Sequence, residues 1–358
     1  MSGPPEPAAA DEPRVRVVGH RYAHHAGRSG YDRIAEHLGG RLACEGGWDL
    51  AARSVLRLPG KLLGWYGGMY PYSRRSFADE VRAAAHSLRR PQDPVFFLYA
   101  ETHFLMSGRL PRAVRRSRLG AAFHYPRETF EEQITATRQF RRLDFAVCMS
   151  RCQVPWVREL APGAEVRFVP HGVDCDYWRP AEKSAARPPG RPLRCLYAGS
   201  HLRDSETFAE FARRAGEAGD AVFEVVGGPP GPLPGEGRTL RRHRNLSDEA
   251  YRRLIQECDL LTLPLLRSTA VNVVLEALAC GVPAVITEGG AADYLNAACG
   301  RVVPAGDAAA LAAAVAGLRR DEPLRLRMAA AARRRAEELD WPAVAGEVRE
   351  LALGGGAG

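Results

Sequence analysis

The sequence predicts an α/β protein made of two doubly wound domains that face each other across a cleft. Three observations favour this class. The chain has 358 residues, a length that suits two ordinary domains better than one. Short apolar segments alternate with segments of helical period along both halves. A stretch rich in proline and arginine separates the two halves near residue 180.

The first half predicts the start of a parallel sheet. Residues 1–13 contain proline, alanine and acidic residues without a basic or apolar leader, so we expect a disordered tail. A strand is expected at 15–19, followed by a glycine-containing turn and a helix at 31–38. Further strands are expected at 95–99, 121–124, 145–148 and 166–169. The stretch 48–77 is irregular and aromatic, and it predicts no element.

The second half repeats the alternation after an expected linker at 171–192. Strands are expected at 193–198, 221–226, 260–264 and 284–287. Helices are expected at 207–216, at 247–257 with Ser247 as its cap, and after Val271. We therefore place a first domain at 14–170, a second at 193–335 and a C-terminal helical segment at 336–358.

Composition is typical of a soluble globular enzyme, with 46% hydrophobic and 26% charged residues. No apolar run reaches the roughly 18–20 residues that span a bilayer. The eight cysteines are scattered, and the close pair Cys148 and Cys152 lacks the second pair that a zinc site needs. We expect buried free thiols in a reducing cytoplasm and no metal site.

The positive charge lies in the first half. Residues 1–170 hold 26 basic and 17 acidic side chains, a net charge of +9, whereas residues 171–358 hold 24 and 25, a net charge of −1. Five arginines follow at near-helical spacing: Arg109, Arg112, Arg115, Arg116 and Arg118. With the aromatic, basic stretch 61–77 they indicate a solvated face, a site for a polar or anionic acceptor, or contact with a membrane surface.

Two other classes of ligand lack their signatures. Positive charge alone leaves nucleic acid open, but the sequence contains no nucleic-acid-binding motif. The first strand is not followed by the G-x-G-x-x-G of dinucleotide-binding domains, because the turn offers only Gly27 and Gly30.

The segment STAVNVVLEALACGVPAVITEGG, residues 268–290, predicts a ligand site. The expected helix begins after a strand and a short loop, at the edge where open α/β sheets bind ligands. Its first backbone N–H groups and its dipole suit a phosphate. The residues at this helix start are Ser268, Thr269, Ala270, Val271 and Asn272.

Glu276 lies about one turn into this apolar helix, where its carboxylate can return to the cleft. A carboxylate accepts two hydrogen bonds at once, as a ribose diol offers them. Gly289 and Gly290 follow the next strand and allow close approach of a ligand to the backbone. The segment therefore predicts a sugar-nucleotide site.

The same segment resembles the nucleotide-binding part of family 4 glycosyltransferases, which are retaining enzymes with two Rossmann-like domains in the GT-B architecture. Other stretches resemble that family in the same order: VPHGVD at 169–174, LYAG at 196–199, FEVVGG at 223–228, GRVVPAGD at 300–307 and LDW at 339–341. The last resembles the point where the family's C-terminal helix crosses back to the first domain. The resemblance covers residues 166–345 well and the first half weakly.

The resemblance assigns roles to individual residues. Glu276 corresponds to the second of two family glutamates, and Ser268 stands where the first would be. Ser200 and Ser205 replace the two cations that hold the diphosphate after Gly199, so Arg203 is the nearest replacement and Arg267 a second candidate. Gly227 ends the next strand. His124 is similar to the family's cleft histidine, with His103 as its rival, and the family's N-terminal glycine pair is replaced by Gly27, Arg28, Ser29 and Gly30.

The resemblance implies a retaining transfer of a hexose-type sugar from a UDP- or GDP-linked donor without a metal ion. The acceptor would be a hydroxyl or amine of a polar or anionic small molecule, a glycan or a lipid. Arg203 and His124 would act on the departing phosphate and the sugar. Two alternatives stay open: a nucleotide-sugar epimerase of the same fold, and a non-catalytic partner protein, which the serines at altered positions favour.

Overall fold

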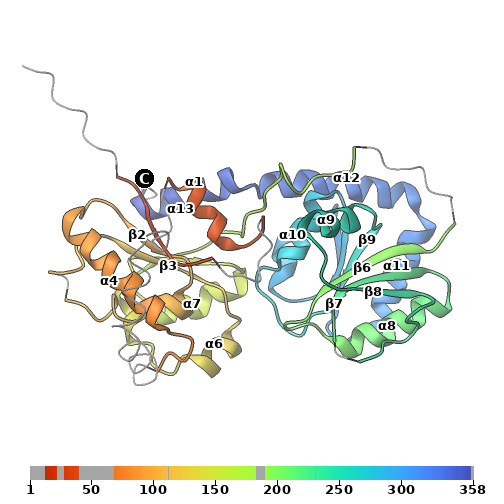
Figure 1. The fold of residues 1–358 in the computed structure, drawn as a ribbon, viewed down its shortest axis with the longest axis horizontal. Helices are drawn as coiled ribbons and strands as arrows, with labels where there is room; N and C mark the ends of the chain where they lie inside the picture. Colours follow the sequence, from red (N-terminus) through yellow and green to blue (C-terminus); the bar gives the residue numbers. More distant parts are fainter. Residues whose placement is uncertain are drawn as a thin grey trace, which may run out of the picture.

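The computed structural model describes residues 13–21, 28–39, 68–111, 113–182, 190–229 and 231–355. Two α/β domains lie side by side, each built around its own parallel sheet (Figure 1). The predicted fold class is therefore confirmed. The predicted tail falls almost entirely outside these residues, as do residues 183–189 of the predicted linker.

The sheet of the first domain has five strands in the order β1-β2-β3-β4-β5. All neighbours are parallel, as the register of Phe97 opposite Ala121 illustrates. Helices cover both faces of such a sheet, so its strands read as continuous apolar runs that sequence patterns detect. The strands are β1 (Arg16–Val18), β2 (Val95–Phe97), β3 (Leu119–Phe123), β4 (Phe145–Cys148) and β5 (Glu165–Phe168).

The helices of the first domain are mostly short. They are η1 (Tyr31–Arg33), α1 (Ile34–His37), α4 (Arg74–Arg89), α5 (Ala100–His103), α6 (Arg127–Gln133), η2 (Arg138–Arg142), η3 (Arg151–Gln153) and α7 (Val154–Leu160). The sequence predicted only the first two, as one helix. The longest of them, α4, buries mainly polar side chains, including Asp79 and Glu80. The sequence therefore has no apolar stripe at helical spacing that would have predicted it.

The basic run at 109–118 does not form a helix, which corrects the spacing argument. The described residues between Phe104 and Arg118 form turns before β3. Arg115 is buried and donates to the Arg142 carbonyl at 3.1 Å, whereas Arg109 and Arg116 are exposed. Arg112 lies outside the described residues. The arginines therefore do not share one solvated face.

The second domain contains a six-stranded parallel sheet in the order β11-β10-β9-β6-β7-β8. Its strands are β6 (Leu193–Gly199), β7 (Ala221–Gly227), β8 (Leu240–His243), β9 (Leu260–Leu263), β10 (Ala284–Thr287) and β11 (Gly300–Val303). The four strands predicted by range in this half lie within one or two residues of their predicted bounds.

The helices of this domain are α8 (Ser205–Glu217), α9 (Asp248–Gln256), α10 (Asn272–Ala279), η4 (Gly290–Tyr294), α11 (Ala308–Arg320) and α12 (Glu322–Glu338). Ser247 caps α9 as predicted, because its side chain accepts a hydrogen bond from the Ala250 N–H. In α10 every residue from Val273 to Ala279 is buried, so this helix lies within the core.

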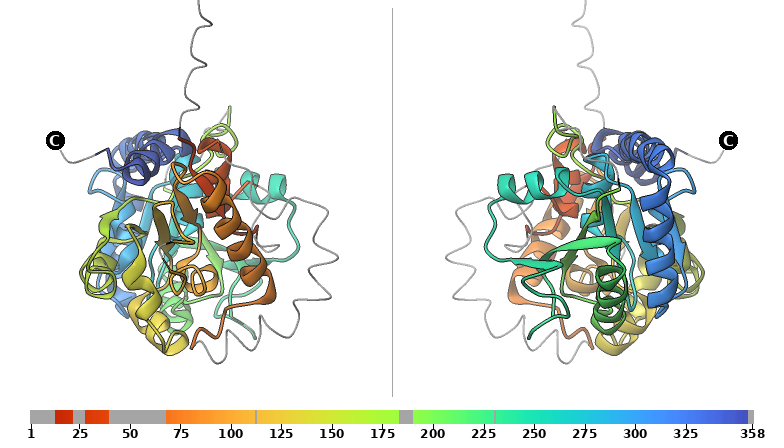
Figure 2. Two further views of the ribbon diagram at one scale, coloured as in Figure 1. Left: turned by 90° about the vertical axis from the view of Figure 1, so that its left-hand side faces the viewer. Right: turned by 90° about the vertical axis from the view of Figure 1, so that its right-hand side faces the viewer.

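The C-terminal helix α13 (Trp341–Leu353) packs on the first domain. Figure 1 shows α12 and α13 running in succession along one side of both domains, and the end-on views in Figure 2 show them on the same flank. Trp341 and Val348 share a core with Val17 and Phe96. The chain passes between the domains twice, in the interdomain crossing after β5 and again between α12 and α13. The two segments meet, because the backbone of Val173 hydrogen-bonds the backbone of Leu339 and Trp341.

Two composition arguments can be compared with the structure. No helix in the described part of the chain is long and apolar enough to cross a membrane. All seven cysteines within the described ranges are free thiols, and only Cys152 is exposed, which confirms the expectation of buried thiols.

Candidate functional site

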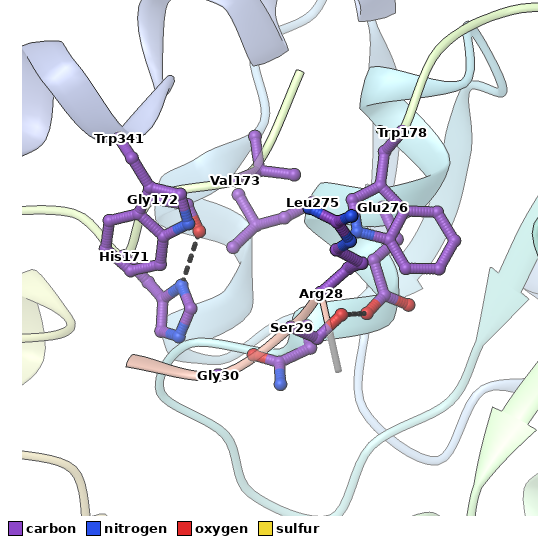
Figure 3. Close-up of a pocket in the computed structure, with 11 residues that line it drawn as sticks. Arg28, Ser29, Gly30, His171, Gly172, Val173, Trp178, Leu275, Glu276 and Trp341 are labelled. Carbon is purple, nitrogen blue, oxygen red and sulfur yellow. Dashed lines mark hydrogen bonds between the residues drawn. The ribbon is translucent and has the colours of Figure 1, made fainter. Parts of the chain in front are cut away.

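A small pocket lies where the two domains meet (Figure 3). Its walls come from the turn before η1, the crossing after β5, helix α10 and the start of α13. They are lined by Arg28, Ser29, Gly30, His171, Gly172, Val173, Trp178, Asn272, Leu275, Glu276 and Trp341. Five of the predicted site residues are thus brought together from positions up to 248 residues apart.

Glu276 is the acid of this pocket, and only 5% of it is exposed. The Ser29 hydroxyl of the first domain donates to its Oε1 at 2.5 Å, as Figure 3 shows. The Tyr251 hydroxyl of α9 also hydrogen-bonds Glu276, and burial, then the charge and the hydrogen bond of this carboxylate, raise the pKa of Tyr251 well above its ordinary value. The carboxylate therefore already binds hydroxyl groups.

Helical spacing explains why a core helix presents this acid. Asn272, Leu275 and Glu276 lie three and four residues apart, so they share one face of α10 and line the pocket. Val273, Val274 and Leu278 belong to the core of the second domain. Glu276 is thus held at the boundary between the core and the pocket.

Positive charge reaches the pocket from the first domain. Arg28 is half exposed, and its Nη1 lies 3.9 Å from Asp174 Oδ2. Its guanidinium also lies 5.4 Å from the centre of the Tyr177 ring. Arg33 Nη2 contacts the same Asp174 carboxylate at 3.4 Å. The Asp174 carboxylate and the Tyr177 ring, both in the segment between the domains, therefore hold Arg28 beside the pocket.

The crossing itself supplies a wall that sequence reasoning missed. The His171 ring is buried between Tyr31, at 5.4 Å, and Trp341, at 5.1 Å, and its Nδ1 lies 2.7 Å from the Gly172 carbonyl oxygen. A Cβ on Gly172 would lie 2.3 Å from the Trp341 ring, so only glycine fits there. The sequence offered one signal for this wall. These residues follow the carboxyl end of a strand, which is where open α/β sheets bind ligands.

The predicted loop before α10 joins the domains instead of lining this pocket. Thr269 Oγ1 donates to the His124 carbonyl of the first domain at 2.6 Å. Ser268 Oγ accepts from the Ala291 N–H at 3.0 Å, and Val271 is the N-terminal cap of α10. Arg267 is exposed, with its Nη1 3.7 Å from Glu132. Their roles toward a ligand stay predictions.

Arg203 lies at the carboxyl end of β6. Its Nε donates to the Ala198 carbonyl at 2.9 Å and its Nη1 to the His201 carbonyl at 3.1 Å. Burial lowers its pKa below the ordinary arginine value, while Tyr251 lies near enough to oppose that shift. Gly199 and Gly227 end neighbouring strands with positive φ, at 92° and 75°. This cluster borders Tyr251, which links it to Glu276.

The two predicted histidines sit at strand ends of the first domain. His124 is partly exposed, and its Nε2 lies 2.7 Å from the Leu98 carbonyl oxygen. His103 is fully buried, with its Nδ1 2.7 Å from Thr102 Oγ1. Neither lines the pocket of Figure 3, and Gly27 lies outside the described residues.

Within the described ranges, no group of three acidic, histidine or cysteine side chains could hold a metal ion.

A buried acid behind His124 makes the stability depend on pH. Glu101 Oε1 accepts hydrogen bonds from the backbone N–H groups of His124, at 2.6 Å, and Tyr125, at 2.8 Å. Burial raises the pKa of Glu101 to about 7, and the pKa of the fully buried Glu80 is also about 7. Both values lie above that of an unfolded glutamate, so the folded state holds these protons more tightly.

We therefore expect these two acids to lower the free energy of unfolding as pH rises from about 5 to about 7, against an opposite contribution from His103 and His86, whose pKa values burial lowers. Each of the two acids contributes a slope of up to about 1.4 kcal/mol per pH unit. Glu101→Gln keeps an oxygen acceptor and removes the charge, so it should flatten its share of the slope. Urea unfolding at several pH values measures this; an unchanged slope in Glu101→Gln would show that Glu101 does not titrate there.

Comparison with known proteins adds the family context. Residues 196–321 match the family model described as glycosyl transferases group 1. A glycosyltransferase from Rickettsia africae is similar in structure over 96% of this chain and 98% of its own, with a TM-score of 0.64 and 13% identity. The chain has the GT-B fold. No curated protein sequence matches it.

Other GT-B structures are similar at the same level. HepE from Anabaena, solved in complex with UDP-glucose, matches 94% of this chain and 98% of its own at a TM-score of 0.61 and 14% identity. Sucrose-phosphate synthase from Thermosynechococcus elongatus matches 76% of this chain and 75% of its own at 0.58 and 17%. The part of this GT-B chain that matches the family model contains Glu276 and helix α10.

Proposed function

We propose that the protein is a glycosyltransferase that moves a hexose-type sugar from a nucleoside diphosphate to a hydroxyl or amine of an acceptor. One observation carries this proposal. A buried glutamate, in a domain that matches the group 1 glycosyltransferase model, faces the interdomain pocket and already holds a hydroxyl group there. A ribose diol presents two such hydroxyl groups to a carboxylate.

The donor nucleotide would lie between Glu276 and the first domain. The ribose hydroxyls would bond to Glu276 in place of the Ser29 hydroxyl, whose bond shows that the carboxylate is within reach of the first domain. UDP is our first choice of nucleotide because the similar protein HepE was solved with UDP-glucose. GDP is the alternative. The pocket encloses only about 10 Å³, far less than the roughly 300–1,000 Å³ of small-molecule sites, so the domains would part to admit a donor.

The bond that breaks joins the anomeric carbon to a phosphate oxygen, and negative charge grows on the departing diphosphate. Arg28 faces the pocket, and the first N–H groups of α10 lie at its edge, so both would stabilise that charge. Arg203 is a second candidate cation, because it lies near Tyr251, which hydrogen-bonds Glu276. We propose that these groups act without a metal ion, that His124 holds the sugar, and that the anomeric configuration is retained.

The acceptor would enter from the first domain, which carries the positive excess of the chain. We therefore propose a polar or anionic acceptor, either a small molecule, a glycan or a lipid headgroup. Peripheral contact of this domain with a membrane surface would follow if the acceptor is a lipid.

The test is product analysis with radiolabelled UDP-glucose, UDP-N-acetylglucosamine and GDP-mannose, each with a panel of hydroxyl and amine acceptors. We expect free nucleoside diphosphate and a labelled acceptor with one donor. Nucleotide-bound sugar of altered configuration would support an epimerase instead. Binding of a nucleotide without any turnover would support a non-catalytic partner protein, as the serines at 200, 205 and 268 suggest.

A further inference from the structure

Helix α4 of the first domain is amphipathic in the reverse sense. Its inner face carries polar side chains, among them Asp79 and Glu80, which are fully buried. Its outer face carries Val81 and Leu88, which are 44% and 45% exposed. A helix that covers a sheet normally turns its apolar face inward and its charged face to water. The outward apolar side chains of α4 therefore need an explanation other than packing on the sheet.

Hydrogen bonds of the buried acids fix α4 in this orientation. The Glu80 carboxylate accepts from the backbone N–H groups of Leu105, Met106 and Ser107, at 3.1, 2.8 and 2.7 Å. Turning the helix over would leave these three donors without their acceptor and would bury apolar groups in their place, which is costly. The apolar side of α4 is therefore held outward by the interior of the domain.

The outward apolar residues form one continuous line. Phe77, Val81, Ala84 and Leu88 are spaced by four, three and four residues, so they lie along one side of the helix. Phe77 and Ala84 are partly buried at the base of this line. At a rise of roughly 1.5 Å per residue the line is about 16 Å long. We call these four residues the α4 strip; it differs from the single exposed apolar residues that are common on protein surfaces.

Positive charge follows one flank of the α4 strip. Arg75, Arg82 and Arg89 are spaced by seven residues, so they lie in a second line beside it. Arg75 and Arg89 are exposed, and Arg74 and Arg90, also exposed, add charge at the two ends of the helix. Both acids of α4 are buried, so its exposed charged side chains are all arginines. A cluster of basic residues on an amphipathic helix is typical of a site for anionic lipids.

The surface lies away from the pocket. Figure 1 shows α4 at the end of the first domain that faces away from the second domain, and the left view of Figure 2 looks onto this end. No residue of α4 lines the pocket of Figure 3. The first 170 residues also carry the positive excess of the chain. A partner bound to α4 would therefore meet positive charge and would leave the pocket uncovered.

We propose that α4 docks on an anionic phospholipid membrane, with the α4 strip in the headgroup region and its arginines on the lipid phosphates. Arginine binds phosphate oxygens with paired hydrogen bonds, and its long apolar stem reaches past a shallow apolar surface. Interfacial helices combine an apolar line with basic residues in this way. A protein interface usually buries about 800 Å² on each side around large apolar side chains, which this single strip does not provide.

The first arm of the test is sedimentation of the full chain with lipid vesicles. We expect binding to vesicles of phosphatidylglycerol and phosphatidylcholine in equal parts, release at high salt, and no binding to phosphatidylcholine alone. The double variant Arg75→Gln, Arg89→Gln should weaken binding about 30-fold, or roughly fivefold for each arginine. The double variant Val81→Gln, Leu88→Gln should weaken it about fivefold or more.

Helix α12 of the second domain supplies the matched controls. Leu326 is 61% exposed, and Arg327 and Arg334 are exposed, so Leu326→Gln and the pair Arg327→Gln, Arg334→Gln remove the same groups from another helix. These variants should bind the vesicles as the wild type does. Far-UV circular dichroism and thermal unfolding check that all variants are folded.

Three results would overturn the proposal. The first is a wild type that does not bind anionic vesicles, and the second is binding that the α4 variants do not weaken. The third is self-association of the wild type in sedimentation velocity that the α4 variants abolish, which would make this face an interface between two copies. The inference does not depend on the proposed sugar transfer: calorimetry with UDP tests the pocket separately, and the α4 variants should bind UDP as the wild type does.

Discussion

Glu276→Ala is expected to weaken UDP binding by about 10²-fold or more. A hydrogen bond to a charged group contributes roughly 1.5–3 kcal/mol, and a ribose diol would make two of them to this carboxylate. A 10²-fold loss corresponds to about 2.7 kcal/mol. Isothermal titration calorimetry with UDP measures the change directly, and Glu276→Gln should lie between alanine and wild type.

Three comparisons make this result specific. Glu217→Ala removes an exposed carboxylate from α8 and should leave UDP binding unchanged. Ser29→Ala removes the hydroxyl that occupies Glu276 Oε1, so it should leave the affinity equal or raise it. Thermal unfolding must show that Glu276→Ala is folded. A folded Glu276→Ala that binds UDP as tightly as the wild type would contradict the assignment of this acid.

Trp341→Ala is expected to lower the free energy of unfolding by about 3–5 kcal/mol. The Trp341 side chain is 2% exposed, and its ring packs on Gly172 and within 6.0 Å of the Tyr31 ring. It connects α13 to the first domain and forms one wall of the pocket. Alanine would leave a large cavity at the point where the two chain crossings meet.

Urea unfolding followed by far-UV circular dichroism measures this loss. Trp341→Phe keeps an aromatic ring in the same place and should lose much less stability. Hydrogen exchange along α13 should rise in Trp341→Ala before it rises in the strands of the second domain. A loss below about 1 kcal/mol would show that α13 is held by its other contacts, such as those of Val344 and Val348.

The sequence predicted the strands that are buried on both faces, and it missed the two edge strands β8 and β11, which are partly exposed. The run at 284–287 and the run at 145–148 were predicted with their observed bounds. Helix α4 was missed for the opposite reason, since its buried face carries Asp79 and Glu80 instead of an apolar stripe. Periodicity detects apolar burial, and these acids are buried because other groups bind to them. Glu80 accepts hydrogen bonds from the backbone N–H groups of Leu105, Met106 and Ser107.

The candidate site could be predicted in its parts but not in its assembly. Glu276 was found because an acid in an apolar helix after a strand indicates a ligand. Its contact with Ser29 joins residues 247 positions apart, and no local pattern reports such a distance. His171 was missed as a pocket residue because its segment was noted only as a resemblance between the domains, and its neighbours Tyr31 and Trp341 come from distant parts of the chain.

The most direct test of the central claim is a crystal structure of the protein with UDP bound. The account predicts that the ribose hydroxyls bond to Glu276, that the diphosphate lies near Arg28 and the start of α10, and that Ser29 no longer donates to Glu276. UDP bound elsewhere in the molecule, with the bond from Ser29 to Glu276 intact, would contradict it.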